Sequence, residues 1–522
     1  MNSCYFLFAL LFLTKANKFL FYETAFARSH LQFAGKLIDV LVENGHTVDV
    51  LVLQYNPDIS TNGTQKFRKL HRINPKNGKE SYWMKMPHFG SPFEKRDMEL
   101  VKYFQKSIVQ FCDALMSDDS LIESLKSENY DAGFTMVYEN CPFGLFHVLN
   151  IKPVIGFVAT ALPNMISDVF KLPSAPSYVL NVLRNPGRSA LELTFFDRLS
   201  LFTAEMKDHF INIPKANAIQ TEVFTAKYGK DFPDLAQLKA EMSIVFVNSE
   251  KVLDAARPLT HKIEFIGGIQ SQTAKPLPKE FQEIYDHSQD GVILFSFGSL
   301  FKTSDIPEHV KHSFLKSFAK FPRYTIIWKY DNMEEDAEMF RNYSNVVPTK
   351  WMPQYDLLSN KRTKVFITHL GQNSYLEVAN AGTPVIAVPL FVDQLFNGAM
   401  AMEKGLGVSI SRFNLTEKSI TEALNEVLSN PKYRLNAKQI SKMLRTQPFT
   451  ARDIFVKNVE YLVENSEVGS HYQLPSVHMP FWKEHSLDVI GFVAACTLLL
   501  VYTLIYIVSR ISQLYSKKSK CD

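Results

Sequence analysis

Residues 351–394 read WMPQYDLLSNKRTKVFITHLGQNSYLEVANAGTPVIAVPLFVDQ, and one turn within this stretch is especially informative. Residues 364–368 (KVFIT) form an apolar, β-branched run typical of a strand, and residues 371–381 have helical spacing. The chain therefore passes from a strand end to a helix start between His369 and Gly371. Backbone N–H groups at a helix start are unpaired and carry the positive end of the helix dipole, which favours a bound phosphate. Gly371 allows the backbone to approach it closely.

This stretch resembles the signature of the UDP-glycosyltransferase family, the inverting transferases that include the UDP-glucuronosyltransferases of animals. The family shows W-x-P-Q, L-L, F-[IV]-T-H-G-G-x-N-S-x-x-E, G-x-P and D-Q in that order. The chain departs from this pattern at Leu370, where many members have glycine, and at Asn360, where many have histidine. It matches the pattern at Trp351, Pro353, Gln354, Leu357, Leu358, Phe366, Thr368, His369, Gly371, Asn373, Ser374, Glu377, Gly382, Pro384, Asp393 and Gln394.

The resemblance implies a binding site for a UDP-sugar. Trp351 would stack on uracil, while carboxylates and amides would bind the hydroxyls of ribose and sugar. Taken singly, Trp351 could be a core residue, Glu377 a solvated helix residue and Asp393 a helix cap. The implied site residues are Gln354 and Glu377 for ribose, Asp393 and Gln394 for the sugar, and Ser299, His369, Gly371, Asn373 and Ser374 for the diphosphate.

A candidate general base lies in residues 26–31 (FARSHL). Apolar residues recur at helical spacing from Ala34 to Val42, and Asn44 then supplies a stop signal, so His30 is expected at a helix start. The helix dipole there opposes protonation and favours a neutral imidazole, which can accept a proton near pH 7. Such a histidine is also common as an ordinary polar cap, but the Ser29-His30 pair resembles the position of the family's base.

Family members orient this base with an acidic residue from a later strand. Alignment of residues 130–146 puts Met136 at that position, and a thioether cannot stabilise an imidazolium. Glu139 and Asp131 are the alternatives, and Glu139 could project from the strand end. Asp131 is equally well explained as an ordinary strand-entry residue.

Strand-like and helical segments alternate through most of the chain, which favours parallel, doubly wound sheets. We therefore expect an α/β fold, and the resemblance implies the GT-B architecture of two Rossmann-like domains facing a cleft. Two prolines in residues 275–279 mark the linker between them. The expected organisation is a signal peptide (1–16), an acceptor-binding domain (17–275), a UDP-sugar-binding domain (276–470), a juxtamembrane segment (471–488), a transmembrane helix (489–508) and a cytosolic tail (509–522).

Both ends of the chain suggest a membrane protein. Residues 5–14 have signal-peptide length, and residues 489–508 are uncharged and would span about 30 Å as a helix. Basic residues follow the second run and acidic ones precede it, which predicts a cytosolic tail and a lumenal body. Lys518 and Lys520 resemble a dilysine retrieval signal of endoplasmic-reticulum proteins, although a stop-transfer tail would look similar. N-glycosylation motifs occur at Asn62, Asn342 and Asn414.

Composition limits the partners and the chemistry. A net charge of +4 over 522 residues gives no broad basic field, so nucleic acid is not expected as a partner. The five cysteines lack C-x-x-C spacing; Cys112 and Cys141 could pair in an oxidising lumen, which sequence alone leaves open. No D-x-D triplet occurs, so we expect neither a metal nor a cofactor, the UDP-sugar being a co-substrate. Aromatic segments at 89–93, 143–146 and 155–162 suggest a small lipophilic acceptor, although they are also typical of a core.

Three functions fit the sequence. The first is transfer of glucuronic acid from UDP-glucuronic acid to a lipophilic acceptor near membrane lipid. The second is the same transfer from UDP-glucose, since no carboxylate-binding arginine is evident. The third is a catalytically silent protein that binds a UDP-sugar or pairs with active relatives as a homo- or hetero-oligomer.

Overall fold

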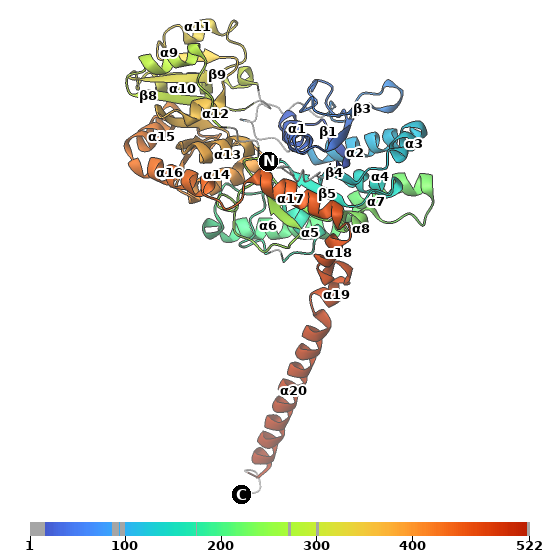
Figure 1. Cartoon of the computed structure of the whole chain (residues 1–522). Helices are drawn as coiled ribbons and strands as arrows, with labels where there is room; N and C mark the ends of the chain where they lie inside the picture. Colours follow the sequence, from blue (N-terminus) through green and yellow to red (C-terminus); the bar gives the residue numbers. More distant parts are fainter. Residues whose placement is uncertain are drawn as a thin grey trace, which may run out of the picture. The chain divides into compact units, whose positions relative to one another are not determined.

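The structure is a computed structural model that describes residues 16–85, 93, 100–173, 175–269, 273–298 and 302–518 (Figure 1). The chain forms two compact units, one ending at Tyr472 and the other beginning at Gln473. The expected signal peptide lies outside the described residues apart from Ala16.

The first sheet is parallel and is built from strands that are buried on both faces. In the described residues it has seven strands in the order β3-β2-β1-β4-β5-β6-β7. β1 (KFLFYET) shows why: an apolar run without clear alternation suits a strand covered on both sides. The strands are β1 (Lys18–Thr24), β2 (Thr47–Leu53), β3 (Lys69–Ile73), β4 (Ala132–Met136), β5 (Val154–Val158), β6 (Ile244–Val247) and β7 (Ile263–Phe265).

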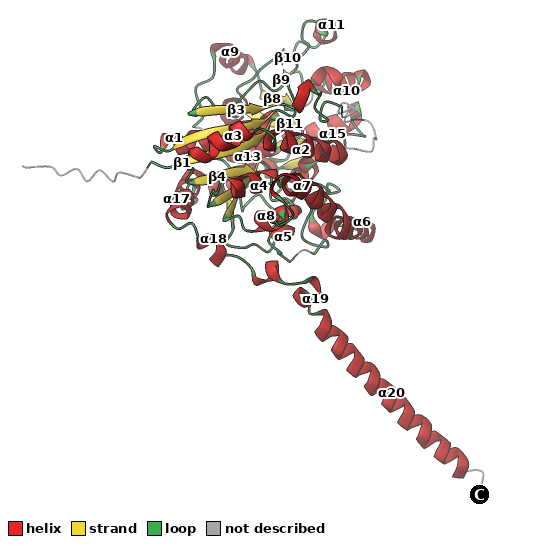
Figure 2. Ribbon diagram, turned by 90° about the vertical axis from the view of Figure 1, so that its right-hand side faces the viewer, coloured by secondary structure: helices red, strands yellow, loops and turns green. Residues whose placement is uncertain are grey.

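Helices connect these strands and cover the sheet (Figure 2). Leu31, Ala34 and Leu37 of the first helix pack with Phe21 and Phe134 in one core, as the helical spacing predicts. The predicted stop is also confirmed, because Asn44 caps this helix. The helices are α1 (Arg28–Glu43), α2 (Leu100–Met116), α3 (Asp119–Ser127), α4 (Cys141–Val148), α5 (Asn164–Val169), α6 (Phe195–Lys207), α7 (Ile213–Tyr228) and α8 (Leu235–Ala240).

The second sheet is also parallel, with six strands among the described residues in the order β10-β9-β8-β11-β12-β13. The strands expected at 291–297, 324–329, 346–347, 364–368 and 384–388 are all present. Their bounds are β8 (Gly291–Ser296), β9 (Tyr324–Lys329), β10 (Val346–Thr349), β11 (Thr363–Thr368) and β12 (Val385–Ala387), followed by β13 (Gly407–Ser409).

The helices of this second half follow the same alternation, with one exception. α17 carries Phe455, Val456 and Val459 into the core of the first sheet, although it lies within residues 276–470. The helices are α9 (Lys279–His287), α10 (Glu308–Phe318), α11 (Ala337–Phe340), α12 (Gln354–Ser359), α13 (Gln372–Ala381), α14 (Asp393–Glu403), α15 (Glu417–Ser429), α16 (Pro431–Arg445), α17 (Ala451–Glu464) and α18 (Val468–His471).

Each sheet has one point where the winding direction reverses. In the first sheet the chain runs outward from β1 through β2 to β3 and then returns to β4 beside β1. In the second it runs from β8 through β9 to β10 and returns to β11 beside β8. Ligands of open α/β sheets bind outside the carboxyl ends of the strands at such points. The loops after β1, β4, β8 and β11 are therefore where a site is expected.

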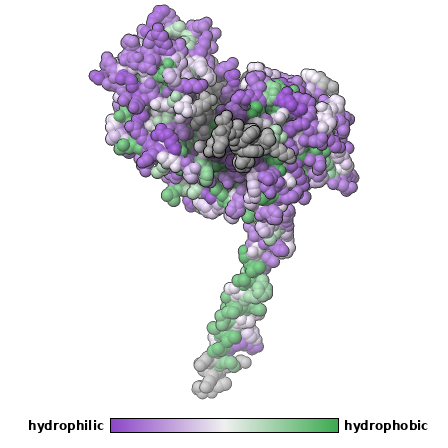
Figure 3. Space-filling view, in the orientation of Figure 1, coloured by the Kyte–Doolittle hydropathy of each residue, from purple (hydrophilic) through white to green (hydrophobic). Residues whose placement is uncertain are grey.

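The second unit contains α19 (Phe481–Glu484) and the long helix α20 (Leu487–Lys518). Its segment from Leu487 to Leu514 is long and apolar enough to cross a membrane, by length and composition. Figure 3 shows apolar residues gathered along this helix. The predicted span at 489–508 lies inside it.

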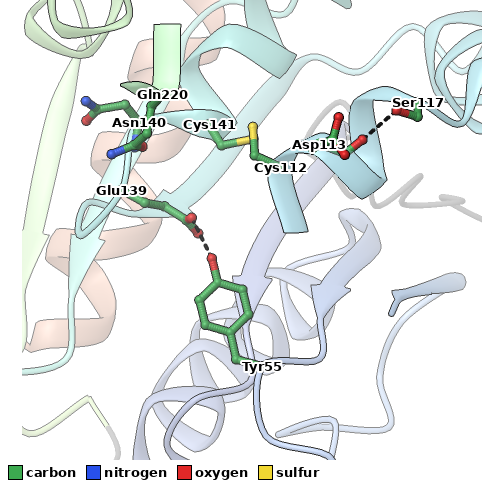
Figure 4. Close-up of a disulfide and its surroundings, with 8 residues drawn as sticks. All are labelled: Tyr55, Cys112, Asp113, Ser117, Glu139, Asn140, Cys141 and Gln220. Carbon is green, nitrogen blue, oxygen red and sulfur yellow. Dashed lines mark hydrogen bonds between the residues drawn. A yellow bond between two sulfur atoms is a disulfide. The ribbon is translucent and has the colours of Figure 1, made fainter. Parts of the chain in front are cut away.

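A disulfide joins Cys112 in α2 to Cys141, the first residue of α4, across a Cα separation of 5.9 Å. The sequence left this pairing open. The bond connects segments 29 residues apart and fixes the start of α4 directly after the end of β4 (Figure 4).

Because a loop of this length restricts the unfolded chain, loss of the disulfide should cost about 3 to 4 kcal/mol. We predict that Cys112→Ser, alone or with Cys141→Ser, lowers the thermal unfolding temperature of the full chain in detergent. Cys496→Ser, in α20, is the matched control and should leave that temperature unchanged. An unfolding temperature of the Cys112→Ser variants equal to that of the unmodified chain would contradict the prediction.

Candidate functional site

The turn after β11 takes the form that the sequence predicts. Gly371 is the residue before α13, and the helix begins at Gln372. Leu370 precedes it with φ of +59°, a left-handed conformation that glycine adopts more easily. Its side chain is fully buried in the core, which holds the backbone in this conformation. The departure from the family pattern at position 370 therefore preserves the turn.

The imidazole of His369 lies against two glycines. A Cβ on Gly298, just after β8, would fall 2.6 Å from Cε1 of His369, and one on Gly371 would fall 2.8 Å from its Nε2. Burial, together with the charge of Lys329, lowers the pKa of His369 to about 4. His369 is therefore neutral near pH 7, and a side chain at either glycine would displace its ring.

A second group of implied donor residues lies where α12 packs near α13. The Trp351 side chain is 70% exposed, so a face of its ring is free to stack on a planar ligand. The Gln354 amide donates to a carboxylate oxygen of Glu377 at 2.6 Å and to Ser374 Oγ at 3.1 Å. Burial raises the pKa of Glu377 to about 7. The structure thus brings Gln354, Ser374 and Glu377 together.

The Asp393-Gln394 pair opens α14. Val392, immediately before it, has φ of +55° and ψ of −129°, which is strained for a β-branched residue. Asp393 accepts a hydrogen bond from Asn397 Nδ2 at 3.2 Å, and burial raises its pKa to about 6. The side-chain carbonyl of Gln394 accepts from the backbone N–H groups of Leu390 and Phe391.

His30 lies in the first turn of α1, after the carboxyl end of β1, and is partly exposed. Its Nδ1 is 3.4 Å from Ser29 Oγ, and its ring centroid is 4.6 Å from that of Phe26 and 5.7 Å from that of Tyr138. Burial lowers the pKa of His30 to about 4. The neutral imidazole predicted from the helix dipole thus has a further physical cause in desolvation.

None of the three candidates for an acidic partner is hydrogen-bonded to His30 in the part of the chain that the structure describes. Met136 is buried at the end of β4. Asp131 accepts a hydrogen bond from the Lys18 backbone N–H, so it lies at the entry of β1 and β4, about 20 Å along the strands from the carboxyl edge. Asp131 is therefore a strand-entry residue, which was the other interpretation of the sequence.

Glu139 lies at the correct edge but is held by other groups. Tyr55 donates to it at 2.9 Å, and Figure 4 shows its carboxylate directed at that phenol. Burial raises the pKa of Glu139 to about 7, with the nearby Tyr22, Tyr55 and Lys239 opposing the rise. It is thus already engaged on the face of the sheet where Tyr22 and Tyr55 lie.

Aromatic side chains surround His30, but they are not those that the sequence highlighted. Phe26 lies 5.7 Å from Trp83, 5.4 Å from Phe104 and 6.2 Å from Tyr138, as ring centroids. By contrast, the aromatic residues in segments 143–146 and 155–162 are buried in the core, as the alternative interpretation held, and segment 89–93 lies outside the described residues except for Phe93. Phe26 is thus the centre of an aromatic cluster beside His30.

The carboxyl edges of the two sheets contact each other. Asn248, after β6, donates to Asn373 at 3.0 Å, and Gln372 donates to the Asn248 carbonyl at 2.6 Å. Burial raises the pKa of Tyr138, which lies beside His30, and the charge of the nearby Asp393 adds to that rise. The implied donor residues and the implied base thus belong to one region of the molecule.

Sequence reasoning missed Asn248, Tyr138 and Lys329. Lys329 ends β9, donates to the Gly298 carbonyl and contributes to the low pKa of His369. Each of the three follows or ends a buried strand, and that position at the carboxyl edge was the available signal. Ser299 lies outside the described residues. Within the described ranges, no group of three or more His, Cys, Asp or Glu side chains is placed to hold a metal ion.

A comparison with known families identifies the chain. The family model described as "UDP-glucoronosyl and UDP-glucosyl transferase" matches residues 18–520. The chain belongs to this family. Among relatives, "Putative UDP-glucuronosyltransferase ugt-48" of Caenorhabditis elegans is 30% identical, with 98% of this chain and 97% of that protein aligned.

Other relatives and solved structures agree with this membership. UDP-glucuronosyltransferase 1A7 of Mus musculus is 28% identical over 77% of this chain and 73% of its own length. UDP-glucosyltransferase 2 of Dactylopius coccus is 28% identical over 79% of this chain and 78% of its own length. The glycotransferase of kitacinnamycin superposes with a TM-score of 0.60 at 17% identity, over 87% of this chain and 99% of that one. A UDP-glucose: anthocyanidin 3-O-glucosyltransferase in complex with UDP superposes with a TM-score of 0.57 at 13% sequence identity, over 87% of this chain and 100% of that one. The expected GT-B fold is confirmed.

If Trp351 stacks on uracil, Trp351→Ala should weaken UDP binding by about 1 to 3 kcal/mol, or about 5- to 150-fold in Kd. Trp351→Phe should retain part of the affinity. Calorimetric titration of the full chain with UDP measures both, and Trp482→Ala in the second unit is the matched control. Because Trp351 is exposed, the unfolding temperature should not change, and an unchanged Kd would contradict the assigned role.

Proposed function

We propose that this family member transfers glucuronic acid, with inversion, from UDP-glucuronic acid to a hydroxyl or similar nucleophile of a small lipophilic acceptor. The observation that carries the proposal is the contact between the two carboxyl edges. It brings Tyr138, which neighbours the neutral His30, close to Asp393, which belongs to the implied donor residues. A base and a donor site in one region are what a direct transfer requires.

The proposed reaction is a single displacement. His30 Nε2 takes the proton from the acceptor hydroxyl, because Nδ1 faces Ser29. The acceptor oxygen forms a bond to the anomeric carbon as the bond between that carbon and the UDP oxygen breaks. Negative charge then develops on the leaving diphosphate. The backbone N–H groups at the start of α13, with His369 and Lys329 nearby, support stabilisation of that charge.

Two cations near the donor residues support glucuronic acid as the sugar. Burial lowers the pKa of Lys329, Asp331 opposes that change, and the charge of Arg28 in the first turn of α1 adds to it, so Arg28 and Lys329 lie close to each other. Like charges held together favour an anionic ligand, and the carboxylate of glucuronic acid would supply one in addition to the diphosphate. Transfer from UDP-glucose is the alternative, because Asp393 and Gln394 suit the hydroxyls of either sugar.

Turnover tests the proposal. Membranes containing the full chain receive UDP-glucuronic acid or UDP-glucose separately, with a pool of phenolic and steroid-like acceptors. We predict acceptor-dependent UDP release with UDP-glucuronic acid, reduced at least about 100-fold in His30→Ala because the general base is lost. His71→Ala, on edge strand β3, is the matched control and should retain full activity.

A second candidate function has its own supporting observation. Within the described residues, His30 has no hydrogen-bonded carboxylate, which a catalytically silent UDP-sugar-binding protein would not need. That function predicts measurable UDP binding with no release above the His30→Ala protein for either donor. Release with UDP-glucose alone would instead support the glucosyltransferase alternative.

We further propose that α20 anchors the chain in the endoplasmic-reticulum membrane with the enzyme in the lumen. The Cys112–Cys141 disulfide supports an oxidising compartment, and Asn342 and Asn414 are exposed enough to be glycosylated. The amide oxygen of Asn62 is instead engaged by Arg72.

A glycosidase shift on gels tests this orientation. Peptide-N-glycosidase treatment should increase the mobility of the protein, and Asn342→Gln with Asn414→Gln should abolish most of that shift. Asn62→Gln is the matched control and should leave it largely intact. No shift in the unmodified chain would contradict a lumenal enzyme.

A further inference from the structure

An imidazole that accepts a proton in a buried site needs an anionic group nearby. Without one, the imidazolium that forms is desolvated and unpaired, which opposes the reaction. In the part of the chain that the structure describes, the one hydrogen bond of the His30 side chain is to Ser29, and the lowered pKa of His30 has burial as its cause. The proposed base therefore needs a partner that none of Met136, Asp131 and Glu139 provides here.

Glu23 is a buried acid whose side chain has no partner. It is 1% exposed, and within the described ranges neither carboxylate oxygen has a hydrogen-bonding group. Burial alone raises the pKa of Glu23 well above its ordinary value. A buried, unpaired carboxyl costs stability, so its presence calls for a functional explanation.

The strand register places Glu23 beside Met136. Phe21 pairs with Phe134 and Tyr22 with Thr135, so the next position sets Glu23 next to Met136. Side chains alternate along a strand, and Phe21 and Phe134 stack with ring centroids 4.4 Å apart on the face covered by α1. Glu23 and Met136 thus point to that same face, while Tyr22 and Thr135 point away.

The face occupied by Glu23 is also the face on which α1 begins. Leu31, the neighbour of His30, packs in the same core as Phe21. Glu23 is the last residue of β1 on this face, since the strand ends at Thr24. By contrast, Glu139 is bonded to Tyr55 on the opposite face. Among the described buried acids at this edge, Glu23 thus has two carboxylate oxygens without a hydrogen-bonding partner.

We propose that Glu23 is the positioning residue for His30, supplying from β1 the carboxylate that Met136 cannot supply from β4. The inference rests on the proposed transferase function. The acceptor O–H bond breaks as an N–H bond forms on His30 Nε2, and the negative charge of the Glu23 carboxylate stabilises the resulting imidazolium. Glu23 does not touch the substrate, and its proton balance is unchanged during the step.

The two groups should titrate as a pair. When the pair holds one proton, it cannot act as a base. Loss of that proton gives the active form, in which Glu23 is charged and His30 is neutral. Among the described polar groups around His30, Ser29 contacts its Nδ1, Tyr138 lies beside its ring with Asp393 near Tyr138, and Arg28 shares the first turn of α1. Activity should therefore rise with pH through the titration of the pair.

The first experiment measures kcat/KM against pH with the full chain in membranes. Glu23→Gln should lower kcat/KM about 100-fold and remove the rise with pH, since it keeps the shape but not the charge. Met136→Asp in the Glu23→Gln protein should raise kcat/KM again by at least about tenfold, because it places a carboxylate on β4 beside position 23. Met136→Leu is the matched control and should restore nothing.

A structural role for Glu23 would give a different result. It would lower the unfolding temperature in Glu23→Gln and would not be rescued by an acid at position 136. We expect the unfolding temperature to change little, since one buried polar group without a partner replaces another. Full activity of Glu23→Gln, with wild-type turnover established, would overturn the proposal.

A second measurement needs no turnover and separates failure of this proposal from failure of the proposed function. Diethyl pyrocarbonate modifies neutral histidine, and peptide mass spectrometry reads its rate at His30 against pH in the full chain. Removing a neighbouring carboxylate should lower the midpoint of that titration by about one pH unit or more in Glu23→Gln. An identical midpoint in both proteins would overturn the pairing, whatever the activity.

Discussion

The backbone N–H groups at the start of α13 are the constraint on which the rest of the site depends. They have no partner within the helix, because a helix cannot satisfy its own first turn, and the N–H of Gln372 donates to the Asp393 carboxylate. Leu370 and Gly371 set the turn that exposes them, and Gln372 and Asn373 bind the end of β6 through Asn248. The same first turn that would hold the diphosphate therefore also fixes the first sheet, which carries His30, against the second.

Burial sets the charge state of the titratable groups around this turn. The pKa values of His30 and His369 are lowered to about 4, and that of Glu377 is raised to about 7. Near pH 7 the two imidazoles are thus neutral, and charge that develops during a reaction would appear in surroundings that screen it weakly. In such surroundings fixed donors stabilise a leaving diphosphate more strongly than water-exposed groups would.

The sequence predicted most of what depends on local pattern. Strands such as β9 and β11, the start of α13 and the helix after His30 all follow from apolar periodicity and turn residues, and the disulfide was one of the open possibilities. What it could not predict depends on register and on contacts between distant segments. Asp131 is near Glu139 in the sequence and Glu23 is far from Met136, but strand pairing places Asp131 at the entry edge of the sheet and Glu23 beside Met136. The contact between Asn248 and α13 joins the two sheets, so no local pattern contains it.

A structure of the full chain with UDP bound tests the central claim most directly, because that claim is that the two carboxyl edges form one site. We predict uracil on Trp351, ribose hydroxyls at Glu377, and the β-phosphate at the N–H groups that begin α13, with His30 on the side of the diphosphate where the sugar would extend. UDP bound away from the start of α13, or His30 turned away from the diphosphate, would contradict the account.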